Sequence, residues 1–263
     1  MPKHILVAHD LSPEADRALQ RAADLARRLD ARLTLLHVGV PGADAEPARQ
    51  LLAARLAGEA LPRAELHLRH GQPAEQILAQ ARGLEADLLV LGSHHRDSPE
   101  GFAGTTLEQV LHASPAPVLL AVSSEPAPWR RALAALDFSP CASRALRLAA
   151  ALLGAEAELH ALHVHEVAAI HAGEDAADLA FQGELFDALM DKERAALPPG
   201  HPRLSHELRQ GERGACLQAV FAERGPQLLA LGAHSRSLLA EALLGSLTRE
   251  LLEQPPCDVL VAR

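Results

Sequence analysis

One set of short motifs occurs twice in this chain, in the same order and at similar spacing. Residues 135–140 read Ala-Leu-Asp-Phe-Ser-Pro and repeat Ala-His-Asp-Leu-Ser-Pro at 8–13. Further repeats are Leu-His-Val at 36–38 and 162–164, Leu-Arg-x-Gly at 68–71 and 208–211, and Leu-Gly-x-His at 91–94 and 231–234. Chance does not place so many matches in one order. The chain is therefore a duplicated unit, and its fold must be one that a single unit can form twice.

Each copy alternates short apolar runs with helical patterns. In the first copy we expect strands at 4–8, 33–38, 64–68, 87–91 and 117–122, and helices at 13–29, 48–57, 74–81 and 106–113. Ser12 and Pro13 suit the start of the first helix. Such alternation predicts α/β architecture: two tandem Rossmann-like domains, residues 1–124 and 129–263, each a five-stranded parallel sheet with helices on both faces. A Ser/Pro-rich linker at 123–128 separates them.

The second copy carries a longer insert after its second strand, at about 168–204. A charged, Ala-rich helix is expected within it at about 175–196, stopped by Pro198-Pro199-Gly200. Its apolar residues could form a groove or lid for an apolar ligand. The equally weighted alternative is that this helix only covers its own sheet. These apolar residues are Leu179, Phe181, Leu185, Phe186, Leu189 and Met190.

Composition excludes several classes of function. Aromatic residues make up only 2% of the chain, which argues against binding of single strands by base stacking. The formal net charge of -9 disfavours nucleic acid and anionic membranes as partners. Three widely spaced cysteines fit a reducing compartment. No apolar run reaches the roughly 18 residues of a spanning helix, and the N-terminus lacks a signal peptide's long apolar region. We expect a soluble, cytoplasmic protein.

The motifs that follow strands one and four mark the expected binding site. In parallel sheets of this kind, ligands bind beyond the carboxyl ends of the strands. Asp10 and Asp137 follow the first strand of each copy, and Gly92 and Gly232 end the fourth. In the second copy, a Gly-Ser pair then opens a helix and aims free N–H groups at an anion. The stretch 232–246 is therefore a candidate phosphate cradle.

These motifs resemble the universal stress protein family. The family pattern is Gly, two residues, Gly, nine residues, then Gly-Ser or Gly-Thr. Here Gly232-Ala-His-Ser235, nine residues and Gly245-Ser246 match it, with Ser235 in place of the second glycine. The resemblance implies domains like those of the adenine nucleotide alpha hydrolases. It also implies an intramolecular pseudo-dimer, in which strand 118–122 lies against 259–261, and pairing of two such chains as a homodimer.

The resemblance further implies ATP as the ligand of the second domain. Asp137 would lie by the ribose and adenine, and Val164 would meet the adenine through its backbone. The phosphates would lie against Gly232, Ala233, His234, Ser235, Gly245, Ser246, Leu247 and Thr248. Few basic residues lie nearby, so Mg²⁺ could supply the missing neutralisation. We expect a stress-response protein that acts as a nucleotide-responsive regulatory module.

The first copy departs from the pattern. His95 stands where a small residue belongs, and the loop is one residue shorter before Gly104-Thr105. Asp97 and Glu100 add negative charge, and Pro99 adds rigidity. A bulky imidazole and extra carboxylates both oppose a triphosphate. We therefore expect ATP in the second domain only.

Plainer interpretations compete with several of these assignments. Asp10 and Asp137 could simply be turn residues ahead of a helix. The pair Gly211 and Gly214 fits an ordinary turn from strand to helix better than a phosphate loop. His160, His163 and His165 share one strand, but their spacing matches no finger pattern of zinc proteins, so we favour solvated or capping histidines. Cys141 begins a helix without a neighbouring base, and Cys216 and Cys257 suit the core.

Two other functions remain open. The protein could be a nucleotide-independent interaction or chaperone-like stress protein that uses the insert at 168–204. It could also be an ATP-dependent ligase or pyrophosphatase of related fold. However, those enzymes carry a Ser-Gly-Gly loop or a His-x-Gly-His signature, which residues 8–12 and 135–139 lack. We identify no paired general acid and base and predict no catalytic residue; slow ATP hydrolysis is the most that we expect.

Overall fold

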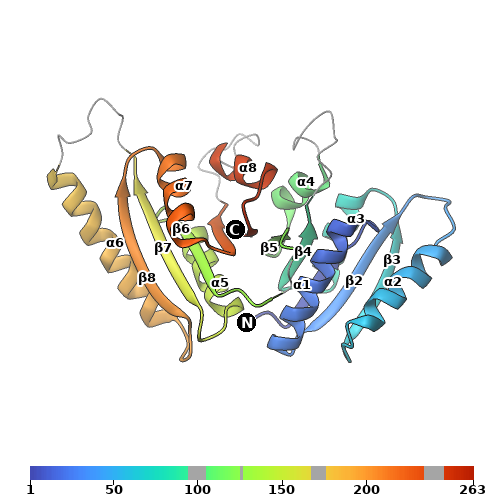
Figure 1. Ribbon diagram of the computed structural model, residues 1–263. Coiled ribbons are helices and arrows are strands. Elements are labelled where there is room, and N and C mark those ends of the chain that lie inside the picture. The colour runs from blue at the N-terminus through green and yellow to red at the C-terminus, as the bar shows by residue number, and fades with distance from the viewer. Residues whose placement is uncertain (94–104, 125–126, 167–175, 234–245) are drawn as a thin grey trace. The chain divides into compact units, whose positions relative to one another are not determined.

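A computed structural model describes residues 1–93, 105–124, 127–166, 176–233 and 246–263 of the 263-residue chain. Its first half is a parallel sheet in the order β3-β2-β1-β4-β5 (Figure 1). The strands are β1 (His4–Ala8), β2 (Arg32–Gly39), β3 (Ala64–His70), β4 (Leu88–Gly92) and β5 (Val118–Ala121). The helices are α1 (Pro13–Leu29), α2 (Glu46–Gly58), α3 (Pro73–Gly83) and α4 (Thr106–Ala113).

The second half repeats this plan, with parallel pairs that give the order β9-β6-β7-β8. Its strands are β6 (Arg131–Leu136), β7 (Glu158–His165), β8 (Arg203–Gln210), β9 (Leu228–Gly232) and β10 (Asp258–Ala262). Its helices are α5 (Pro140–Leu152), α6 (Ala176–Ala196), α7 (Arg213–Arg224) and α8 (Ser246–Glu253). The predicted α/β class, with two Rossmann-like halves of parallel strands and flanking helices, is confirmed.

Local sequence explains where the helices begin. Ser12 and Ser139 are the N-caps of α1 and α5, and each hydroxyl accepts a hydrogen bond from an N–H in the first turn. A proline follows each cap, where its fixed φ suits the first helical position. The predicted start of the first helix is therefore confirmed. Predicted strand and helix limits lie within about two residues of the observed ones, the usual uncertainty of such limits.

The core is built from aliphatic side chains, as the scarcity of aromatics requires. Central strands such as β1 and β4 are apolar on both faces, which is typical of parallel strands covered by helices. Small residues on α1 let it approach the sheet closely: Ala18, Ala22 and Ala23 are fully buried. The strand ends are thereby held firmly enough to present a site.

The contacts between residues divide the chain into two compact units. One contains Met1–Ala127 and Arg249–Val259, and the other contains Pro128–Thr248 and Leu260–Arg263. Residues 249–259, from the second half of the sequence, therefore belong to the first compact unit. In the second unit, the end of β10 lies beside the end of β9, where the N–H of Ala233 donates to the carbonyl of Ala262. Within the described residues, we find no helix long and apolar enough to cross a membrane.

Candidate functional site

The turn after the first strand of each half has the same unusual backbone. Leu11 and Phe138 adopt left-handed φ angles of 73° and 62°, which cost energy for residues other than glycine. The Oδ1 atoms of Asp10 and Asp137 accept hydrogen bonds, both of 3.0 Å, from the N–H two residues on. Both aspartates are therefore turn residues, and both carboxylates also lie exposed at the carboxyl ends of β1 and β6.

A histidine from the neighbouring strand fixes each turn. Nδ1 of His37 lies 2.7 Å from the carbonyl oxygen of His9, and Nδ1 of His163 lies 2.8 Å from that of Leu136. Each histidine donates through Nδ1, because a carbonyl can only accept. The half-buried residues that follow, Val38 and Val164, therefore sit at equivalent places beside the turns. Asp137 and Val164 are thus brought to one end of the sheet, as predicted.

Gly92 and Gly232 allow a helix to approach the end of the fourth strand. A Cβ atom on Gly92 would lie 2.7 Å from the carbonyl carbon of Glu14, in the first turn of α1. On Gly232 it would lie 2.3 Å from the backbone nitrogen of Ala142, in the first turn of α5. Neither distance is possible for a real side chain. The immediate role of Gly232 is therefore to let α5 pack closely on the end of β9. From the sequence, Gly232 was assigned only to phosphate contact.

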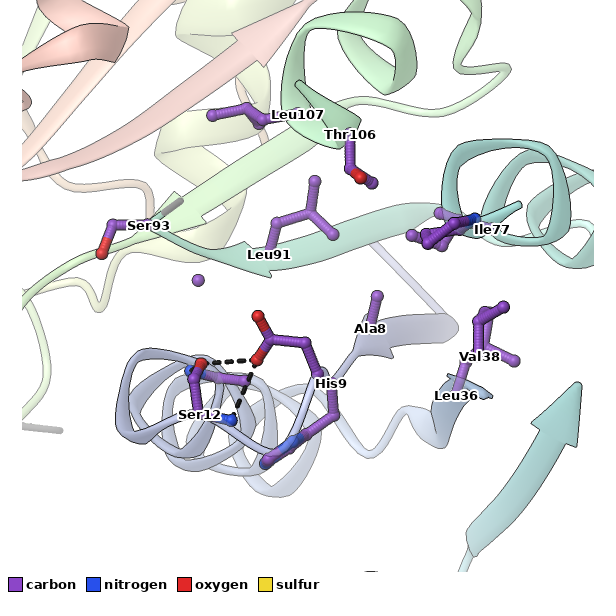
Figure 2. A pocket seen from close by; sticks show the side chains of 14 residues that line it. Ala8, His9, Ser12, Leu36, Val38, Ile77, Leu91, Ser93, Thr106 and Leu107 are labelled. Carbon is purple, nitrogen blue, oxygen red and sulfur yellow. Dashed lines mark hydrogen bonds between the residues drawn. The ribbon is translucent and has the colours of Figure 1, made fainter. Parts of the chain in front are cut away.

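A cavity of about 370 Å³ opens at the strand ends of the first unit. Its volume lies within the range of about 300–1,000 Å³ that is usual for small-molecule pockets. Figure 2 shows its walls, which come from β1, α1, β2, α3, β4 and α4. It is lined by Ala8, His9, Asp10, Ser12, Ala15, Leu36, Val38, Pro73, Ile77, Leu91, Gly92, Ser93, Thr106 and Leu107. Among these described lining residues there is no lysine or arginine, and Asp10 is the one carboxylate.

His9 supports one wall of this cavity through a chain of polar contacts. Its Nε2 lies 2.9 Å from Oδ1 of Asp16, and Nε of Arg55 lies 3.0 Å from the same oxygen. The N–H of Leu11 donates to Nδ1 of His9 over 3.0 Å, so the ring stabilises the strained turn. Burial lowers the pKa of His9 below its ordinary value of 6.5, against the opposing effect of Asp16. A neutral ring can accept from Leu11 and donate to Asp16 at once.

In the second unit an aromatic cluster occupies the neighbourhood of the turn. The ring of Phe138 meets His163 edge-on at 4.5 Å between centroids. Phe186 from α6 lies 5.5 Å from His163 and 5.4 Å from the ring of His206. Phe186 is 1% exposed, whereas Phe138 is 39% exposed. The helix of the insert therefore packs on its own sheet, and one aromatic face remains open at the strand ends.

Only part of the predicted phosphate loop lies among the described residues. Gly232 and Ala233 do, at the end of β9. His234, Ser235 and Gly245 lie outside the described residues, as do His94, His95, Asp97, Pro99, Glu100 and Gly104 of the first copy. Ser246, Leu247 and Thr248 form the first turn of α8, so the predicted helix start after Gly245 is confirmed. Their roles toward a ligand stay predictions.

The competing interpretations of the other motifs can also be compared with the structure. Gly211 and Gly214 flank the N-cap of α7, where the Glu212 carboxylate accepts from the N–H groups of Gly214 and Ala215. Those N–H groups lower the pKa of Glu212 and leave this helix start occupied by a carboxylate, so the turn interpretation is confirmed. In the described parts of the chain, no group of three His, Cys, Asp or Glu residues is placed to hold a metal.

Sequence reasoning missed the cavity of the first unit. Thr106 and Ile77 were not considered, although Leu247, the repeat equivalent of Thr106, was already assigned to the phosphates of the second copy. Aligning the two copies residue by residue would have found Val38, because Val164 was already assigned. The cavity walls come from six separate elements, and no local sequence motif indicates that these elements meet.

The buried histidines predict a dependence of stability on pH. Burial lowers the pKa values of His4, His9, His160 and His163 below 6.5 in the folded protein, so the unfolded chain binds protons first as the pH falls. The free energy of unfolding should therefore decrease as the pH is lowered from about 6.5. The decrease is at most about 1.4 kcal/mol per pH unit for each histidine. Urea unfolding at pH 7.5, 6.5 and 5.5 measures this change.

A matched pair of variants locates the effect. His163→Gln keeps an N–H donor for the carbonyl of Leu136 and should reduce the pH slope. His70→Gln, at the exposed end of β3, should leave the slope unchanged. A free energy of unfolding that is constant from pH 7.5 to 5.5 would contradict the prediction.

Comparison with known proteins agrees with this duplicated architecture. A sequence model described as "Universal stress protein family" matches residues 1–121 and 128–263. The protein named "Universal stress protein in QAH/OAS sulfhydrylase 3'region" of Thermus aquaticus is 34% identical over 135 residues, which cover 46% of this chain and 98% of that protein. The chain thus contains about two lengths of such a protein.

Solved structures reproduce the fold over the whole chain. The crystal structure of a universal stress protein from Archaeoglobus fulgidus has a TM-score of 0.72 and 21% identity, covering 99% of this chain and 98% of that one. A universal stress protein solved in complex with cAMP is similar over 47% of this chain and 98% of its own, with 24% identity and a TM-score of 0.41.

Proposed function

Because the chain belongs to the universal stress protein family, we propose that it binds an adenine nucleotide, ATP, in its second repeat. Repeats at 1–124 and 129–263 would then have different roles. The second would act as a nucleotide-responsive regulatory module in the cytoplasm, with the first as its structural partner and two chains pairing as a homodimer. Val164 and Asp137 would meet the nucleoside, and the stretch 232–248 would meet the phosphates with Mg²⁺.

The observation that carries this proposal is a difference in charge between equivalent positions. The first turn of α1 carries Glu14 and Asp16, whereas Cys141 and Ser143 stand at the equivalent positions of α5. Carboxylates at a helix N-terminus compete with a bound anion for the same positive potential. Removing them therefore favours phosphate in the second repeat.

A basic residue adds to this difference. Pro73 lines the cavity of the first unit, and its equivalent in the second repeat is Arg213. Arg213 is near enough to His163 to lower the pKa of that ring, although burial is the main cause. Its guanidinium lies 2.6 Å from Glu166, which stands where the first repeat has Val40. At these four positions the second repeat is two charge units more positive than the first. Arg55, which pairs with Asp16 in the first unit, offsets one of those units.

The test is calorimetric titration of the full chain with ATP and Mg²⁺. We expect a sub-millimolar dissociation constant. Val164→Trp should fill the space beside the turn of the second repeat and raise that constant about tenfold or more, which corresponds to about 1.4 kcal/mol. The matched variant Val38→Trp, at the equivalent place in the first unit, should leave it unchanged.

Variants in the two loops sharpen the assignment. Gly245→Glu should abolish ATP binding, and Gly104→Glu should leave it intact. Loss of binding in Gly104→Glu or Val38→Trp would assign the nucleotide to the first repeat instead. A wild-type chain that takes up no adenine nucleotide with Mg²⁺ would end the proposal. The interaction or chaperone-like function of the insert at 168–204 would then be preferred.

A second candidate function rests on the cavity of the first unit. Its described walls are mainly aliphatic and carry one carboxylate, so they suit a small ligand without phosphate that is neutral or cationic. Adenosine, titrated against wild type and Val38→Trp, is a suitable probe. Binding that Val38→Trp removes and Val164→Trp preserves would support this site, whereas equal binding by both variants would exclude it.

A further inference from the structure

A buried ion pair lies in the first compact unit, and neither of its residues lines the strand-end cavity. Nε of Arg21, on α1, lies 3.1 Å from Oδ2 of Asp258, the first residue of β10. Their side chains are 3% and 0% exposed. Arg21 comes from the first half of the sequence, and Asp258 belongs to the segment 249–259 that completes this unit.

The polar atoms of the pair have further partners. Oδ1 of Asp258 accepts from the N–H groups of Val122 and Ser123, over 2.8 and 2.9 Å. Nη1 of Arg21 donates to the carbonyl of Ala127 over 2.8 Å. Asp258 therefore fastens the segment 249–259 both to α1 and to the chain just after β5. Burial lowers the pKa of Arg21, and the nearby carboxylate opposes that shift.

Such a pair is weak as a source of stability, but it is selective. Desolvation of two charges offsets most of their attraction, and well-packed apolar residues can replace a buried pair at little cost. An unpaired charge in the same place is strongly unfavourable. A buried pair therefore discriminates sharply against any segment that supplies only one of its members.

The duplicated sequence contains a segment, equivalent to residues 249–259, that lacks the acidic member of this pair. Aligning Leu119-Leu120-Ala121 with Leu260-Val261-Ala262 places Pro117 opposite Asp258, and aligning the two Ser-Pro helix starts places Leu148 opposite Arg21. The first repeat thus offers an arginine and a proline, and the second offers a leucine and an aspartate. The side chain of proline supplies neither a carboxylate for Arg21 nor an acceptor for the N–H groups of Val122 and Ser123.

We propose that Arg21 and Asp258 select which repeat completes the first unit. Its docking surface accepts the segment 249–259 of a second repeat and rejects the equivalent segment, residues 108–118, of a first repeat from another copy of the chain. The reverse exchange is rejected for the same reason, since a second repeat presents Leu148 to Asp258. The pair therefore keeps the first unit matched to a second repeat and suppresses exchange between like repeats during folding.

The test compares selectivity with stability in the full chain. Arg21→Leu with Asp258→Val removes both charges and leaves an apolar contact. This double variant should be more stable than either single variant, because it leaves no buried charge unpaired, although the N–H groups of Val122 and Ser123 lose their side-chain acceptor. Refolded from urea at high concentration, it should give a mixture of exchanged assemblies, whereas the wild type returns to one species. Light scattering after size-exclusion chromatography and native mass spectrometry measure the fractions.

The single variants complete the cycle. Arg21→Leu or Asp258→Val alone should lower the folding equilibrium constant by about a hundredfold or more, since each leaves a buried charge unpaired. If one of the single variants fails to fold, the number of species formed by the refolded double variant still tests the proposal. A double variant that refolds to the same single species as the wild type would overturn the proposal. ATP titration of the double variant is a separate readout and does not enter this decision.

Discussion

Replacing Gly232 with alanine should lower the free energy of unfolding by about 3 kcal/mol or more, at the upper end of the range for overpacked sites. The added Cβ would lie 2.3 Å from the backbone nitrogen of Ala142 and 2.7 Å from its Cα. Both are main-chain atoms in the first turn of α5, so no side chain can turn aside. Either the helix start or the end of β9 has to move.

The chain offers a matched control for this change. A Cβ on Gly154 would meet nothing within 4 Å, so Gly154→Ala should change the free energy of unfolding by no more than about 0.5 kcal/mol. Gly92→Ala tests the same packing in the first unit, against Glu14 and Ala15. Urea unfolding followed by circular dichroism measures all three variants. A Gly232→Ala variant as stable as Gly154→Ala would show that the helix start is not packed against the strand.

Truncating Phe186 to alanine should cost about 3–5 kcal/mol, the usual range for a buried phenylalanine. Its ring is 1% exposed and contacts the rings of His163 and His206. Loss of the ring opens a void against β7 and β8, and it also removes cover from the histidine that fixes the turn at Phe138. The variant should therefore weaken ATP binding as well, if the second repeat holds the nucleotide.

Phe181 provides the comparison on the same helix. It lies five residues earlier, is 55% exposed, and should tolerate alanine within about 0.5 kcal/mol. If Phe186→Ala proves as mild as Phe181→Ala, α6 does not belong to the packed second unit. The lid function considered for the insert would then regain weight. Thermal unfolding of the two variants side by side distinguishes these outcomes.

The repeated motifs made much of the fold predictable. Helix starts at Ser12-Pro13 and Ser139-Pro140 depend on local capping and on the fixed φ of proline, so they can be predicted from neighbouring residues alone. Strands such as β1 and β4 are short and almost wholly apolar, with His4 as the one polar residue of β1, and glycine or polar residues bound them. Asp137 and Gly232 could be placed at one end of a sheet because parallel strands carry their carboxyl ends to the same edge, whereas Val164 was assigned from the family resemblance.

The site was less predictable, because its properties arise from contacts distant in sequence. The role of Gly232 against α5 depends on how closely that helix packs, and the cavity beside Val38 depends on six elements that converge. Phe186 was identified only as an apolar residue of the insert. Whether it would face a ligand or its own sheet depends on the packing of α6, and the structure places it on the sheet.

The amino-acid sequence by itself determined that this chain is a duplicated α/β protein that resembles the universal stress protein family, with two unequal glycine loops. Periodicity, capping and repetition are local properties, and the sequence records them directly. Tertiary structure alone decided that residues 249–259 complete the first unit and that Arg21 meets Asp258. These residues are distant in the chain, and only folding removes them from water together, so the energy of their pairing exists only in the folded protein.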